Sequence, residues 1–328
     1  MLLPRFFVTA VSFVLAIAAL PATGWSQEPY PSKPIRLVVP FAAGGGVDNF
    51  ARPLAKRLSE QLGQQVVIDN KPGASGLIGG QLVANSPPDG YTLLASTDTS
   101  MYLSSLVMKA PGFDPVQHLT PIISAAITPT VVVVHPSLPI RTMKELVEYV
   151  KKSPEPVPYV TAGAGSLHHL TGESLARVTD GKLLHVGYKG GSPALNDLLG
   201  GQVKVGILIL SVIAPHVQSG KLRAIAVIEN HRSKIYPDIP TIAQSGVPGF
   251  SMPDTAIAMW GPAGLPPEIV EKINEEVRKA MQSPEVSQTM QKTGYEATPG
   301  TAAAFAAQAA KSYANYQRMV KETKLSAQ

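Results

Sequence analysis

The sequence predicts an α/β protein made of two similar lobes, each with a largely parallel sheet. Short apolar segments typical of strands alternate with helical patterns along the chain. A strand, a turn of small residues and a helix follow one another at residues 35–62 and again at residues 158–178. The length of 328 residues leaves room for both lobes and a sizeable core.

The N-terminal segment has the pattern of a secretory signal peptide. Arg5 precedes an apolar run at residues 6–20, which is shorter than the roughly 20 residues that a membrane-spanning helix needs. We expect residues 1–26 to be cleaved from an exported protein. Cysteine is absent, so we expect no disulfide, no thiol chemistry and no lipid anchor on an N-terminal cysteine. The formal charge of +5 is scattered, which argues against nucleic acid and favours small acidic molecules as partners.

The first strand–turn–helix unit predicts an anion site at the end of its strand. An apolar strand at residues 35–39 leads into Gly44, Gly45 and Gly46, which permit backbone conformations closed to other residues. Asp48 is the expected N-cap of the following helix. The free amides and the positive dipole end of that helix suit a negatively charged ligand.

The segment between the two units predicts a short helix and two strands. We expect the helix at residues 77–84 and the strands at residues 91–95 and 131–134. Ser96 and Thr97 follow the first of these strands. Because open α/β sheets place ligand contacts at such strand ends, both hydroxyls are candidate contacts, with a solvated loop as the alternative.

The second unit repeats the plan of the first. Thr142 and Glu145 have the spacing of a capping box and predict a helix that precedes this unit. A strand at residues 158–161 then leads through small residues to Ser166, the expected N-cap of the next helix. Later strands are expected at residues 183–186, 203–210 and 221–227, and later helices at residues 192–200, 267–281, 284–294 and 305–320.

Enzyme motifs are absent or incomplete in this chain. The glycine turns lack the GKS or GKT of a Walker loop and the GxGxxG spacing of dinucleotide sites, and no GxSxG occurs. Ser166 neighbours His168 and His169 in sequence only. His169 and Glu173 have the i, i+4 spacing of two metal ligands, but no third ligand is evident. We therefore predict no catalytic residue, no metal and no cofactor.

The chain contains, in order, the segments YPSKPIRLVVPFAAGGGVDNFAR, NKPGASG, PPDGYTLL, TAGAGSLHHLTGE, YKGGSPALNDLLGGQV, GKLRAIAV and YPDIPTIAQSGVPGF. Together these segments resemble the Bug family of periplasmic solute-binding proteins, the receptors of tripartite tricarboxylate transporters. The resemblance implies a type II periplasmic-binding-protein fold, in which two α/β lobes joined by a hinge enclose a ligand cleft. It implies lobe 1 at residues 27–130 and 250–328 and lobe 2 at residues 131–249.

The resemblance also implies a function. It predicts a monomeric periplasmic receptor, not an enzyme, that holds a small mono- or dicarboxylate and passes it to membrane permease subunits. The family's two gripping loops match residues 41–48 and 161–169, the turns that the physical argument also selects. With the strand-end positions, the predicted ligand contacts are Phe41, Ala43, Gly44, Gly45, Gly46, Val47, Asp48, Ser96, Thr97, Thr161, Gly163, Ser166, His169 and Leu208.

One position departs from the family pattern. Many relatives carry an aspartate, usually followed by asparagine, where this chain has Leu208 and Ile209. An acid there would hold an amino group, so an amino acid is disfavoured as ligand and an aliphatic or aromatic carboxylate is favoured. The alternative is that Leu208 simply packs in the core.

Two further functions stay open at this point. A ligand sensor that docks on a membrane signalling protein would share all these sequence features. A periplasmic hydrolase would use Ser166 or the pair His169 and Glu173, and it requires turnover that substitution of Ser166 or His169 abolishes.

Overall fold

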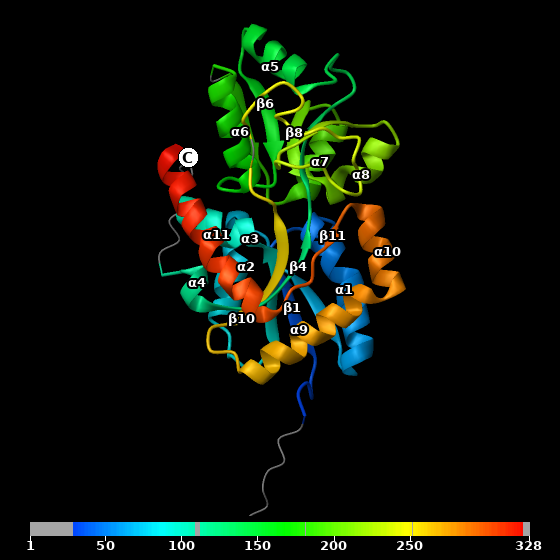
Figure 1. Ribbon diagram of the computed structural model, residues 1–328, viewed down its shortest axis with the longest axis vertical. Coiled ribbons are helices and arrows are strands. Elements are labelled where there is room, and N and C mark those ends of the chain that lie inside the picture. Colours follow the sequence, from blue (N-terminus) through cyan, green and yellow to red (C-terminus); the bar gives the residue numbers. More distant parts are fainter. Residues whose placement is uncertain (1–28, 109–111, 181, 251, 324–328) are drawn as a thin grey trace, which may run out of the picture.

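The computed structural model describes residues 29–108, 112–180, 182–250 and 252–323. It shows two lobes, one above the other along the long axis of the molecule (Figure 1). Each lobe is a sheet flanked by helices, and the predicted two-lobed α/β fold is confirmed. The expected signal peptide at residues 1–26 lies outside the described residues.

The first lobe contains a six-stranded sheet in the order β11-β4-β10-β3-β1-β2. β1 pairs in parallel with β2 and β3, whereas β10 pairs antiparallel with β3 and β4. β1 and β10 are inner strands of this sheet, and they are apolar because both of their faces are largely buried. The strands are β1 (Ile35–Val39), β2 (Val66–Asn70), β3 (Thr92–Thr97), β4 (Leu119–Ile127), β10 (Ala256–Pro262) and β11 (Glu296–Ala297).

The second lobe repeats this topology in a five-stranded sheet of order β7-β6-β8-β5-β9. β6 pairs in parallel with β7 and β8, and β5 pairs antiparallel with β8 and β9. The strands β2-β1-β3-β10-β4 of the first lobe therefore correspond one to one to β7-β6-β8-β5-β9 of the second. The tip of β1 is equivalent to that of β6, and the tip of β3 is equivalent to that of β8. The strands are β5 (Thr130–Val134), β6 (Val157–Thr161), β7 (Leu183–Gly187), β8 (Val205–Ile209) and β9 (Arg223–Val227).

Helices cover both sheets and enclose the apolar core of each lobe. The first lobe carries α1 (Gly46–Leu62), the short turn η1 (Ala74–Gly76), α2 (Leu77–Ala84), α3 (Asp98–Val107), α4 (Pro115–His118), α9 (Pro267–Gln282), α10 (Pro284–Thr293) and α11 (Ala302–Thr323). The second carries α5 (Met143–Lys152), α6 (Leu167–Val178), α7 (Gly191–Leu199) and α8 (Leu210–Gln218). Within the described part of the chain, no helix has the length and apolarity needed to cross a membrane.

Local sequence signals identify several of these helices. The capping box is confirmed, because the Thr142 hydroxyl accepts from the Glu145 amide at 3.2 Å and the Glu145 carboxylate accepts from the Thr142 amide at 3.0 Å. Three helices were missed, namely α3, α4 and α8. α3 follows β3 without a loop, and α8 begins at Leu210, where a strand was expected to continue.

The chain passes between the lobes twice, from β4 to β5 and from β9 to β10. The Thr128 amide donates to the Thr255 carbonyl at 2.9 Å, and the Glu229 carboxylate accepts from the Thr130 amide at 2.9 Å. These bonds tie the two crossing segments together, which makes them the candidate hinge. β5 begins one residue before the expected start of lobe 2, and the lobe boundaries stay a prediction.

Candidate ligand-binding cleft

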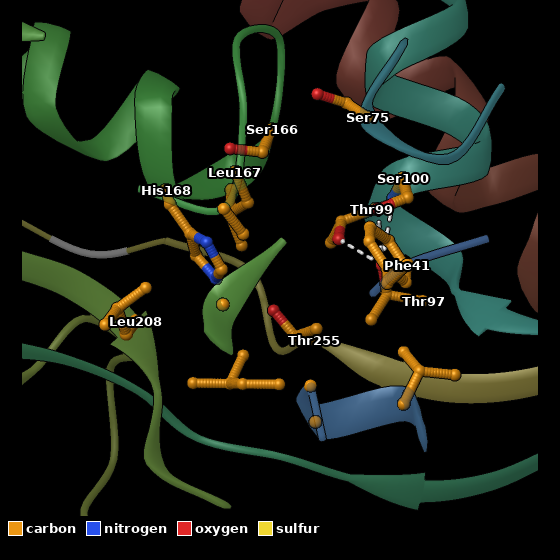
Figure 2. A pocket seen from close by; sticks show the side chains of 16 residues that line it. Phe41, Ser75, Thr97, Thr99, Ser100, Ser166, Leu167, His168, Leu208 and Thr255 are labelled. Atoms are coloured by element: carbon orange, nitrogen blue, oxygen red, sulfur yellow. Dashed lines mark hydrogen bonds between the residues drawn. The ribbon is translucent and has the colours of Figure 1, made fainter. Parts of the chain in front are cut away.

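A cavity lies between the two lobes, at the tips of the parallel strands (Figure 2). The first lobe lines it with Phe41, Gly45, Gly46, Val47, Ser75, Thr97, Thr99 and Ser100. The second lobe contributes Ala162, Ser166, Leu167, His168, Gly191, Leu208 and Ile209, and the second crossing segment contributes Thr255.

A buried carboxylate fixes the turn after β1. Gly44 has a φ of +75°, which side chains rarely adopt, and its amide donates to the Asp48 carboxylate at 2.8 Å. Asp48 is 1% exposed and also accepts from Arg52 at 2.7 Å and from Asn70 at 2.9 Å. Burial raises the pKa of Asp48, but the bonds from Arg52, Gly44 and Asn70 outweigh it and hold this pKa below its ordinary value. Asp48 therefore stabilises the turn from behind the cavity.

α1 begins one turn earlier than expected. The prediction that Asp48 is its N-cap is wrong, because Gly45 is the N-cap and Asp48 lies in the first turn. A carboxylate in that turn still interacts favourably with the helix dipole. The amides of Gly46 and Val47 have no acceptor within the helix, and both residues line the cavity.

The turn after β6 is built in the same way on the opposite side of the cavity. Ser166 is the N-cap of α6, as predicted, since its hydroxyl accepts from the His169 amide at 3.2 Å. The same hydroxyl donates to the Gly163 carbonyl at 2.6 Å. The first-turn residues Leu167 and His168 line the cavity, so α6 also directs free amides toward it.

His169 supports this turn and does not line the cavity. Its Nδ1 accepts from the Gly165 amide at 3.1 Å, and its ring stacks on His185 with centroids 3.9 Å apart. Its Nε2 lies 3.6 Å from Glu173 Oε1. No group of three potential metal ligands occurs among the residues that the structure describes. His169 is therefore held in place by Gly165, His185 and Glu173, and its contacts are those of a residue that supports the turn.

The tips of β3 and β8 give the cavity one polar and one apolar wall. Thr97 is the N-cap of α3, and its hydroxyl accepts from the Ser100 amide at 3.2 Å and donates to the Ser100 hydroxyl at 2.7 Å. Thr99 donates to Thr97 at 3.2 Å (Figure 2). At the equivalent tip of β8, Leu208 and Ile209 present apolar side chains. Leu208 also packs in the core of the second lobe, so it lies at the boundary between core and cavity.

Three hydrogen bonds join the lobes beside the cavity. Ser192 donates to the Ala43 carbonyl at 3.2 Å, and Ser104 donates to the Gly165 carbonyl at 3.1 Å. Ser75 donates to the Ala164 carbonyl. Each bond runs from a side chain of one lobe to the backbone of the other, so this structure shows the cleft closed.

The described lining of the cavity carries no formal positive charge of its own. Among the described lining residues, none is a lysine or an arginine. Burial lowers the pKa of His168 to about 4, so its imidazole is neutral near pH 7. A negative group here would be held by the first-turn amides of α1 and α6 and by hydroxyls, which form strong bonds to a charged acceptor.

The predicted contact residues divide into two groups. Those that line the cavity are Phe41, Gly45, Gly46, Val47, Thr97, Ser166 and Leu208. Those that do not are Ala43, Gly44, Asp48, Ser96, Thr161, Gly163 and His169. Gly163 instead lines a neighbouring hollow that shares Phe41, Ser75 and Ala162 with the cavity. Contact of any of these residues with a ligand stays a prediction.

Nine lining residues were not among the predicted contacts, namely Ser75, Thr99, Ser100, Ala162, Leu167, His168, Gly191, Ile209 and Thr255. Of these, Ala162, Leu167 and His168 do lie within the gripping loop expected at residues 161–169, and Ile209 adjoins the predicted contact Leu208. A signal existed for the residues beside predicted strand tips, because Thr99 and Ser100 follow Thr97 directly. No local signal placed Thr255, which the hinge brings to the cavity from a long crossing segment.

Comparisons with known proteins agree with this geometry. A family model described as tripartite tricarboxylate transporter family receptor matches residues 50–325. Protein BugT of Bordetella pertussis is 34% identical over 293 residues, which are 89% of this chain and 89% of BugT. The structure of the periplasmic binding protein BugD has a TM-score of 0.84 at 34% identity, over 91% of this chain and 100% of that chain. R. palustris Rpa4515, solved with adipate, has a TM-score of 0.85 at 33% identity, over 90% of this chain and 99% of that chain.

Proposed function

This chain belongs to the tripartite tricarboxylate transporter receptor family, and on that premise we propose that it is a periplasmic receptor for a small mono- or dicarboxylate. The acid binds in the cavity between the lobes, without turnover. The receptor acts as a monomer and passes the acid to the permease subunits of a tripartite tricarboxylate-type transporter. The observation that carries the proposal is the start of α1 and α6 on opposite sides of one cavity whose described lining has no lysine or arginine.

The energies of this arrangement decide which interactions matter. Each helix end contributes about 0.3–1 kcal/mol, or about 2 kcal/mol when partly buried, whereas micromolar affinity needs about 8 kcal/mol. The helix dipoles alone are therefore insufficient. Hydrogen bonds to a charged acceptor add about 1.5–3 kcal/mol each, so a few first-turn amides together with both dipoles reach the micromolar range. Closure of the lobes is what brings all of these donors to one carboxylate.

A relative supports the chemical class of the ligand. Rpa4515, 33% identical to this chain over most of both chains, was solved with adipate, a six-carbon dicarboxylate. The shared fold and the anion-binding turns make a carboxylate the first class to test. The apolar side chains of Leu208 and Ile209 favour an acid with a hydrocarbon portion over an amino acid.

A binding screen tests the proposal. Thermal denaturation of the purified protein is measured with a panel of two- to eight-carbon mono- and dicarboxylates, and at least one acid is expected to raise the midpoint. Failure of every acid to do so would contradict a carboxylate receptor. Hydrolysis of a bound compound would contradict a receptor without turnover.

A pair of matched variants localises the binding site. Ser166→Ala removes the N-cap of α6 beside the cavity, whereas Thr142→Ala removes the N-cap of α5 far from it in the fold. Both lose a cap worth about 0.5–2 kcal/mol of stability. By calorimetric titration, Ser166→Ala alone is expected to weaken binding of the best acid, by about 5- to 30-fold. Equal affinities in the two variants would place the ligand elsewhere.

A further inference from the structure

One region of the cavity carries buried polar atoms that the protein leaves unpaired. His168 is 8% exposed, Thr255 is 1% exposed, and both residues line the cavity. No hydrogen bond within the described residues reaches His168 Nδ1 or Thr255 Oγ1. Buried polar atoms almost always have a hydrogen-bond partner. Because these two unpaired atoms lie at the wall of a cavity, they indicate that a bound ligand supplies the missing partner.

The two side chains converge from different parts of the fold. His168 lies in the first turn of α6, and Thr255 lies at the end of the second crossing segment, just before β10. Figure 2 shows the imidazole ring and the threonine hydroxyl directed toward the same region of the cavity. The Thr255 carbonyl accepts from Thr128, and the next amide, that of Ala256, donates to Asp98 at 3.0 Å. The backbone therefore fixes the hydroxyl in place although the hydroxyl itself has no partner.

The chemistry of these groups selects a neutral oxygen. A neutral imidazole has one donor and one acceptor nitrogen, and a hydroxyl both donates and accepts. A ligand hydroxyl matches both groups, because it donates to one and accepts from the other. A second carboxylate in this place would lose its water without gaining a counter-charge, since the described lining residues include no lysine or arginine.

We propose that His168 and Thr255 form a second polar subsite that takes a hydroxyl group on the carbon chain of the bound acid. The ligand class is then a hydroxy-monocarboxylate, with its carboxylate at the helix ends and its hydrocarbon portion beside Leu208 and Ile209. This inference rests on the proposed function. It adds a specificity-determining pair that was not among the contacts predicted from the sequence.

Calorimetric titration with six-carbon acids tests the subsite. The probes are hexanoate, adipate and the five hydroxyhexanoates substituted at carbons 2 to 6. We expect one hydroxyhexanoate to bind about tenfold more tightly than hexanoate, because each buried hydrogen bond adds about 0.5–1.5 kcal/mol and none is left unmade. The same acid is expected to bind more tightly than adipate.

Variants then assign the preference to these residues. Thr255→Val and His168→Leu, each nearly the same size as the original side chain, are expected to reduce the hydroxyl preference to less than about threefold. Thr255→Ser and His168→Gln keep hydrogen-bonding groups and are expected to retain most of it. Thr289→Val, on the exposed side of α10 where its hydroxyl donates to the Glu285 carbonyl, is the control and leaves the preference unchanged. Circular dichroism checks that each variant is folded.

The possible outcomes separate this inference from the function on which it rests. Binding of hexanoate or adipate without a hydroxyl preference refutes the subsite and leaves the carboxylate receptor standing. A hydroxyl preference that persists in both Thr255→Val and His168→Leu also refutes the subsite. Absence of binding by every acid of this series and of the two- to eight-carbon panel refutes the receptor, and the subsite with it.

Discussion

Gly46 marks a contact between the lobes that has no room for a side chain, and this makes closure of the cleft testable. A Cβ added at Gly46 would lie 1.8 Å from Ile209 Cδ1 and 2.9 Å from both Ile209 Cγ1 and Ser211 Oγ. Gly46 belongs to α1 in the first lobe, whereas Ile209 and Ser211 belong to the second. Gly46→Ala must therefore push the lobes apart or displace Ile209 whenever the cleft closes.

The contact of Gly46 with Ile209 and Ser211 determines how Gly46→Ala should change ligand affinity and stability. Overpacking of a tight site costs about 1–3 kcal/mol, so a clash present only in the closed, liganded state would weaken binding by about 5- to 150-fold. Gly46 does not have a positive φ, and alanine in a helix is favoured over glycine by about 0.5–1 kcal/mol. The unliganded variant is therefore expected to be as stable as the wild type or more stable. Titration with adipate and the best acid of the screen measures affinity, and thermal denaturation without ligand measures stability.

Two further proteins make this prediction decisive. Gly300→Ala is the matched control, because a Cβ there meets no atom within 4 Å, and it should bind like the wild type. Ile209→Ala combined with Gly46→Ala removes the Ile209 atoms that the new methyl group meets and leaves only Ser211 Oγ close to it, so the double variant should bind better than Gly46→Ala alone. Wild-type affinity in Gly46→Ala, or no recovery in the double variant, would refute the idea that binding requires this closure.

Three more predictions follow from other contacts. Ser104→Ala removes an interlobe hydrogen bond and should weaken ligand binding, measured by calorimetry, by about 2- to 10-fold. An unchanged affinity would contradict this prediction. Burial raises the pKa of Glu229 to about 8 from an ordinary value near 4.5. Between these pH values the folded protein retains a proton that the unfolded chain releases. The free energy of unfolding therefore falls as the pH rises through this range. Urea denaturation at pH 5 and pH 8 measures the difference in the free energy of unfolding, and Glu229→Gln should make this difference smaller. Buried Asp98, whose pKa is about 7, should preserve part of the difference. The same difference in the wild type and in Glu229→Gln would contradict the prediction. Gly172→Ala places a Cβ 2.1 Å from the buried Tyr159 ring and should lower the thermal midpoint by overpacking, whereas helix propensity alone would raise it.

The sequence predicted those parts of the fold that local chemistry determines. The turn at Gly44 requires a positive φ, and the glycine in the sequence predicts it. The caps at Thr142 and Ser166 are single residues whose hydroxyls bond to amides three positions away, so their spacing suffices to find them. α3 was missed because nine of its ten residues are buried. A helix covered on all sides has no polar face, so the period that identifies an amphipathic helix is absent.

The lining of the cavity was less predictable because it depends on tertiary geometry. His168 and His169 are neighbours in sequence, but successive helical residues differ by about 100° around the axis, so only one of them faces the cavity. Sequence reasoning chose His169, whose imidazole instead accepts from the Gly165 amide and stacks on His185. Which face of α6 meets the other lobe is decided by how the lobes close. Thr255 likewise reaches the cavity only because the hinge bonds hold its segment there.

Selectivity in this receptor would arise from a chemical difference between two topologically equivalent lobes. The strand tips after β3 and β8 occupy matching places, yet one presents the Thr97 hydroxyl and the other presents Leu208 and Ile209. A polar ligand atom against the apolar tip would be buried without a partner, at a cost of about 1–3 kcal/mol. The hydrocarbon portion of an acid held between α1 and α6 therefore belongs beside β8, and its oxygens belong toward the first lobe and Thr255. In the proposed receptor, the repeated fold would supply the grip on the carboxylate, and the unequal walls would determine which carboxylate fits.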